Sequence, residues 1–158
     1  MKSGIYIEWQ GQEFSGESIG DRRWIHVPIS APEPTGEGWA ANRTLRVWSK
    51  LVPASEITRM YGVFTSAKLD NVEVYVEIVD PAAREAVVRA KKGASINDQN
   101  KTPPHPLLEA VPESSYSLNW MGTVPWDRLT DVDEAVGRID PATGEDLPDR
   151  HGHEEAGP

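Results

Sequence analysis

The side chains that could do chemistry in this chain are few, and they do not gather into a motif. Catalysis needs convergent groups with a physical reason for shifted pKa values. The chain has no cysteine, so a thiol nucleophile, a disulfide and a thiolate metal site are excluded. A serine nucleophile elbow and a phosphate-binding glycine loop are also missing from the sequence. We therefore predict that the protein is not an enzyme and uses no cofactor.

Metal ligands are available in two places, but neither has the pattern of a metal site. Three carboxylates lie close together in the sequence: Asp127, Asp131 and Asp133. The glycine and terminal glutamate of a calcium hand are absent there, so a charged helix start is the better interpretation. His151 and His153 could bind a transition metal only weakly. His26, in a predicted strand, is interpreted as a structural histidine, and His105, among prolines, is expected to face solvent. No metal site is predicted.

Aromatic residues are the compositional feature that favours a binding function, because the chain has six tryptophans. Trp48 is predicted to lie on the same strand face as Arg46 and Lys50, and aromatic rings beside cations can stack on single-stranded nucleic acid. The residues of this possible nucleic-acid face are Tyr6, Arg46, Trp48, Lys50 and Tyr75. The competing interpretation is that another part of the chain covers these rings as a second core layer, and we favour it.

A second group of apolar residues follows a proline-rich stretch. Residues 97–112 contain four prolines and are expected to form an extended arm. The arm and the segment after it carry aliphatic and aromatic side chains: Leu107, Leu108, Tyr116, Leu118, Trp120 and Trp126. Such side chains need a dry surface. The arm therefore either packs on its own sheet or docks on a neighbouring protein, and we predict that these residues bind a partner.

The elements that position these residues centre on a predicted hairpin. In residues 72–79 the side chains alternate, which places Val72, Val74, Val76 and Ile78 on one face of a half-buried strand. Asp70 and Asn71 tolerate positive φ and favour a tight turn back to a strand at 63–69. Counting outward from this turn places Lys68 opposite Glu73.

A helix is predicted after the hairpin. Asp80 and Pro81 are typical of a helix start, and small side chains recur at helical spacing up to Gly93. Shorter helices are expected at 53–61 and 131–139, and strands at 5–9, 24–29 and 44–52. The predicted fold class is α+β: a mainly antiparallel β-sheet or barrel-like domain with one main helix at about 81–92, short peripheral helices, and an extended C-terminal arm and tail.

Charge and composition suggest three regions. A strand-rich globular domain is predicted at 1–96, the proline-rich arm with a short helix at 97–139, and a flexible tail at 140–158. The net charge of -9 arises entirely in the last part of the chain: residues 1–106 carry 13 basic and 13 acidic side chains, and residues 107–158 carry 3 and 12. An acidic tail has little affinity for nucleic acid or for an anionic membrane.

Two functions are compatible with these features. The first is a protein–protein interaction or assembly subunit that docks its aromatic arm on a neighbouring protein or on another copy, as part of a larger complex or a virion-like assembly. The second is a single-stranded nucleic-acid-binding protein of barrel type, with the acidic tail as an internal competitor. No signal peptide and no apolar run of about 20 residues is present, so a soluble, cytoplasmic protein with no membrane partner is expected.

Overall fold

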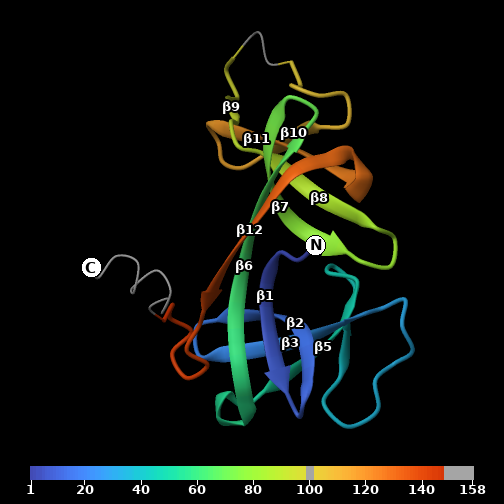
Figure 1. The fold of residues 1–158 in the computed structure, drawn as a ribbon, viewed down its shortest axis with the longest axis vertical. Coiled ribbons are helices and arrows are strands. Elements are labelled where there is room, and N and C mark those ends of the chain that lie inside the picture. The colour runs from blue at the N-terminus through green and yellow to red at the C-terminus, as the bar shows by residue number, and fades with distance from the viewer. Residues whose placement is uncertain (99–101, 148–158) are drawn as a thin grey trace. The chain divides into compact units, whose positions relative to one another are not determined.

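The computed structural model describes residues 1–98 and 102–147, and almost all regular structure in them is antiparallel β-sheet (Figure 1). The strands are β1 (Gly4–Trp9), β2 (Gln12–Ile19), β3 (Arg22–Pro28), β4 (Ala40–Asn42), β5 (Val47–Val52), β6 (Ile57–Leu69), β7 (Val72–Asp80), β8 (Glu85–Ala90), β9 (Ala94–Ser95), β10 (Glu109–Pro112), β11 (Ser117–Pro125) and β12 (Leu129–Arg138). Two short 3-10 helices are η1 (Ala54–Glu56) and η2 (Trp126–Arg128). Neither of these helices has the length or the hydropathy that crossing a membrane requires.

The chain folds into two compact units. The first unit contains Met1–Ser3 and Phe64–Ala135, and the second contains Gly4–Val63 and the described residues from Val136 onward. Strands β6 and β12 pair with each other, and each contributes residues to both units. The predicted division at residues 96 and 139 stays a prediction, and residues 148–158 of its last part lie outside the described residues.

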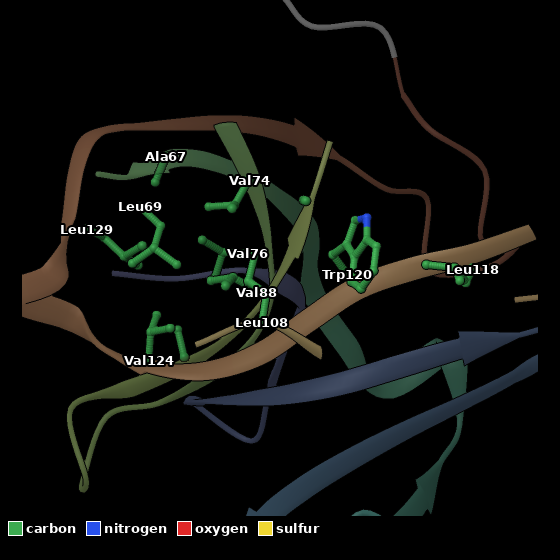
Figure 2. Packing of buried hydrophobic residues seen from close by; sticks show 12 residues of the cluster. Ala67, Leu69, Val74, Val76, Val88, Leu108, Leu118, Trp120, Val124 and Leu129 are labelled. Carbon is green, nitrogen blue, oxygen red and sulfur yellow. The ribbon is translucent and has the colours of Figure 1, made fainter. Parts of the chain in front are cut away.

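In the first unit the strands follow the order β10-β11-β8-β7-β6, and alternate side chains of β6, β7, β8 and β11 are buried, whereas β10 is exposed along its length. Figure 2 shows aliphatic side chains from these strands pointing toward one another, with Trp120 of β11 at one side of the cluster. The buried cluster consists of Ala67, Leu69, Val74, Val76, Ala86, Val88, Ala90, Leu108, Leu118, Trp120, Val124 and Leu129.

The predicted central hairpin is confirmed, including its register. Leu69 pairs with Val72 and Lys68 with Glu73, and Asp70 has the positive φ (54°) that the tight turn requires. This register places the valines of β7 and the small residues of β6 on the same buried face.

The main helix predicted at 81–92 is wrong, because this segment forms a turn and strand β8. The Asp80 carboxylate accepts a hydrogen bond from the Ala83 amide at 3.1 Å, so Asp80 stabilises a tight turn rather than capping a helix. The small residues Ala86, Val88 and Ala90 also alternate with period two, and all three are buried against the rest of the sheet. The sequence allows both a helical period and a strand period, and burial of every second residue favours the strand.

The short peripheral helices of the predicted fold class are also wrong, and the predicted extended arm forms strands. Only η1 is helical within 53–61, after which β6 begins, and residues 131–138 lie in β12. The segment after the prolines forms β10 and β11, and β11 pairs with β8 along five residues. The chain is therefore an antiparallel β-sheet protein over residues 1–98 and 102–147, in which the arm supplies strands to the sheet.

In the second unit the strand order is β6-β1-β2-β3-β5-β4. Strand β2 has no clear apolar alternation, and the sequence analysis missed it. The core contains Ile7, Ile25, Val52, Ile57, Met60 and Ile139. Residues after β12 pack on this unit, since Ile139 pairs with Asp146 and the buried guanidinium of Arg23 donates hydrogen bonds to the carbonyls of Pro141 and Gly20 at 2.9 and 2.7 Å.

Candidate functional site

The six predicted partner-binding residues of the arm have different environments. Leu108, Leu118 and Trp120 belong to the core of the first unit and are at most 5% exposed. Trp126 packs against the same core, and its indole N–H donates to the Glu85 carbonyl at 2.9 Å. Leu107 (39%) and Tyr116 (77%) are the exposed members. The structure therefore brings most of these side chains onto the protein's own sheet.

The five residues of the predicted nucleic-acid face do not share one face. Tyr75 lies in the first unit and the other four in the second. Within the second unit Tyr6 pairs with Ser15, Ser15 with His26, and His26 with Ser49, so Tyr6 lies on the same face as Ser49. Trp48 and Lys50 are the neighbours of Ser49 on β5 and therefore lie on the opposite face. The Lys50 ammonium lies over the Trp9 ring at 5.4 Å, and the Trp48 indole N–H is buried without a hydrogen-bond partner. Arg46 is exposed in the turn before β5.

A serine, a histidine and a carboxylate do meet in the second unit. Nδ1 of His26 is 2.8 Å from the Ser49 hydroxyl, and its Nε2 is 3.7 Å from a Glu17 carboxylate oxygen. These residue types can activate a serine nucleophile. However, Ser49 is only 7% exposed and His26 only 9%, so a substrate carbonyl cannot reach the hydroxyl. The arrangement supports the predicted structural role of His26.

This buried histidine makes stability depend on pH. Burial lowers the pKa of His26 below 6.5, and the nearby Glu17 only partly opposes that shift. Because its pKa is lower in the folded state than in the unfolded state, the histidine contributes stability at pH values above its unfolded-state pKa. This contribution is lost as the pH falls through the folded-state pKa. We expect urea unfolding to show a loss of stability as pH falls below about 6.5 that His26→Gln largely removes. An equal loss of stability in His26→Gln would show that another group causes this pH dependence.

The second histidine is also buried, contrary to the expected solvent exposure of His105. Its Nε2 is 2.7 Å from the Asp70 carboxylate, and its Nδ1 accepts a hydrogen bond from the Leu107 amide at 3.0 Å. Arg128 also contacts Asp70, at 3.1 Å. The hydrogen bond from His105, with the Arg128 charge, lowers the pKa of Asp70. These contacts hold the proline-rich loop against the central hairpin turn, so the cluster is structural.

An exposed apolar surface on the first unit lies on the side of its sheet that faces away from the core. We call this surface the outer face, and its apolar members are Phe64, Tyr75, Ile78, Val87 and Met121. Phe64 is 62% exposed and Ile78 58% exposed. Strand pairing connects these positions, since Tyr75 lies opposite Arg89, Arg89 opposite Met121, and Ile78 opposite Val87.

Charged side chains surround the aromatic centre of this face. The rings of Phe64 and Tyr75 are 5.2 Å apart. The Arg89 guanidinium and the Lys91 ammonium lie 4.9 and 5.2 Å from the Tyr75 ring centroid. Arg89 also forms an ion pair with Glu77 at 2.6 Å. The Arg89 charge is therefore already balanced within the protein, and the apolar rings beside it remain accessible.

Sequence reasoning found only Tyr75 among the apolar members of the outer face. Ile78 was predicted to share the buried face with the valines of β7, and that placement is wrong. A β-bulge between Val76 and Ile78 shifts the register, so Ile78 pairs with the outward Val87, and Val79 takes the inward position opposite Ala86. The alternation of residues 63–69 was the available sequence signal, since it places Phe64 on the side of the strand opposite to Val63 and Thr65.

The described part of the chain contains no group of three or more histidine or acidic side chains close enough to hold a metal ion. Asp131 forms an ion pair with Lys68 at 3.6 Å, and His151 and His153 lie outside the described residues. Comparisons with family models, with curated proteins and with solved structures give no match to this chain.

Proposed function

We propose that this protein is a non-enzymatic protein-binding module that docks a protein partner on the outer face of its first unit, as an assembly or accessory subunit. The main support for this proposal is the exposure of Phe64 and Ile78 beside Tyr75 on one side of the sheet. Large exposed apolar groups of this kind are typical of interaction surfaces. A cytoplasmic location remains part of this proposal.

The composition of the outer face fits a protein partner better than nucleic acid. Aromatic, methionine and arginine side chains are enriched at the centres of protein interfaces, and charged groups at their rims. The cations near the Tyr75 ring are accompanied by Glu73 and Glu77, and the whole chain carries a net charge of -9. A phosphate backbone would be repelled by that excess of carboxylates. The nucleic-acid alternative therefore has the weaker support.

The proposal is tested by capturing proteins from an extract of the source organism with the tagged full-length chain. We expect Phe64→Asp to weaken capture of the partner at least about tenfold, because a carboxylate replaces an apolar side chain at the centre of the interface. The matched control is Ile19→Asp, which introduces the same charge at a residue of similar exposure (59%) in the second unit. A partner retained equally by both variants would contradict the proposal.

A further inference from the structure

A cavity of about 370 Å³ lies beside the buried cluster of the first unit. Its floor is apolar and contains Trp120 of β11, Ala90 of β8 and Val72 of β7, which belong to this cluster or pack against it. The floor is therefore on the core side of the sheet, opposite the outer face. The volume is within the range of small-molecule sites.

Backbone contacts fix the walls of this cavity. The Lys91 amide donates to the Glu73 carbonyl at 2.9 Å, which holds the end of β8 against the start of β7. A Cβ atom at Gly93 would come within 2.6 Å of the Leu118 carbonyl, so the segment after β8 packs tightly against β11. The sheet itself therefore forms the cavity before any ligand binds.

The Trp120 indole N–H is a donor without an acceptor among the residues that the structure describes. Trp120 is only 5% exposed, and in Figure 2 its nitrogen lies on the edge of the ring turned away from Val88 and Leu108. The nitrogen is not fully enclosed, because the enclosed side-chain atoms without a partner in the described chain are Nε1 of Trp48 and Nε2 of His26. Since Trp120 lines the cavity, a molecule in the cavity can accept its hydrogen bond.

The charges around the cavity are balanced, with two ammonium groups and two carboxylates. These belong to Lys91, Lys92, Glu73 and Asp98. Charge therefore selects neither an anion nor a cation, whereas the indole N–H selects a ligand that carries an oxygen acceptor.

We propose that this cavity binds a small ligand with an apolar body and a carboxylate or amide oxygen. The oxygen accepts a hydrogen bond from the Trp120 indole, and the apolar body packs on Val72 and Ala90. This inference is independent of the proposed function, because its site lies on the other side of the sheet from the outer face.

The inference is tested by NMR of the indole N–H signals in the full-length chain. Without a probe, we expect the Trp120 N–H to exchange with solvent at least about tenfold faster than the Trp126 N–H, which donates to the Glu85 carbonyl. Millimolar benzoate or benzamide should shift the Trp120 signal downfield and leave the Trp126 signal in place. Benzylamine, which has no oxygen acceptor, should shift neither. A shift with benzoate alone assigns a carboxylate ligand, and a shift with both probes or with benzamide alone includes neutral amides.

Replacing Trp120 by benzothienylalanine removes the N–H and keeps nearly the same ring shape. We expect this change to weaken binding of the probes about tenfold, as followed by the methyl signals of Val72 and Ala90. Any of three results would overturn the inference. These are a Trp120 N–H that exchanges as slowly as that of Trp126, no shift of its signal with either oxygen-bearing probe, and equal binding by the benzothienylalanine protein.

Discussion

Replacing Trp120 with alanine is expected to lower the free energy of unfolding by about 3–5 kcal/mol, the usual cost of removing a large aromatic side chain from a core. Trp120 is 5% exposed and lies in the buried cluster with Leu118 and Val88 (Figure 2). The cavity left by the indole cannot be filled without moving β11 or β8, which pair with each other. Denaturant unfolding followed by circular dichroism measures the change.

The matched control is Tyr116→Ala, because Tyr116 belongs to the same predicted arm but is 77% exposed. We expect it to change stability by no more than about 0.5 kcal/mol. This pair of variants also decides between the two interpretations of the arm. If Trp120→Ala unfolded like the wild type but lost a partner, Trp120 would be an anchor on another protein and its place in this core would be wrong.

Arg23→Ala is expected to have a comparable effect in the second unit, about 3–5 kcal/mol. Arg23 is 1% exposed, and its guanidinium donates to the carbonyls of Gly20, Arg22 and Pro141. A hydrogen bond from a charged donor contributes about 1.5–3 kcal/mol, and these partly exposed carbonyls recover part of the loss by binding water. Arg23→Lys should recover only part of the loss, since one ammonium cannot serve acceptors on both sides of a planar guanidinium.

The neighbouring exposed residue provides the control for this second prediction. Arg22→Ala removes the same charge from the same strand and should change stability by about 0.5 kcal/mol or less. Hydrogen exchange gives a local readout: the Gly144 amide, which donates to the Asp140 carbonyl at 2.7 Å, should lose protection in Arg23→Ala. Equal stability of the two alanine variants would show that Arg23 does not hold the segment after β12.

Local signals in the sequence were sufficient for the hairpin of β6 and β7. The turn residue Asp70, the valine alternation and the Lys68–Glu73 pair all pointed to one register, and the structure has it. The segment after Asp80 was different, because its small residues fit both a helical and a strand period. Only pairing with β11, which is distant in the sequence, makes the strand the better solution.

The candidate site was harder to predict for a related reason. Alternation placed Tyr75 on the outward side correctly, but a one-residue bulge moved Ile78 to that side as well. A bulge depends on how two strands meet and leaves no clear trace in the strand's own sequence. In the same way, the aromatic and aliphatic residues after the prolines indicated a need for a dry surface, but not that the surface was the chain's own sheet.

Photo-cross-linking from position 64 tests whether the outer face binds protein. A benzophenone side chain placed at position 64 is irradiated in the full-length chain, alone and in the extract, with position 19 as the control. We expect protein adducts at position 64 that are absent at position 19, and peptide mapping shows whether the captured chain is a second copy or another protein. Equal labelling at both positions, or no protein adduct at position 64, would show that the outer face is not a protein-binding surface.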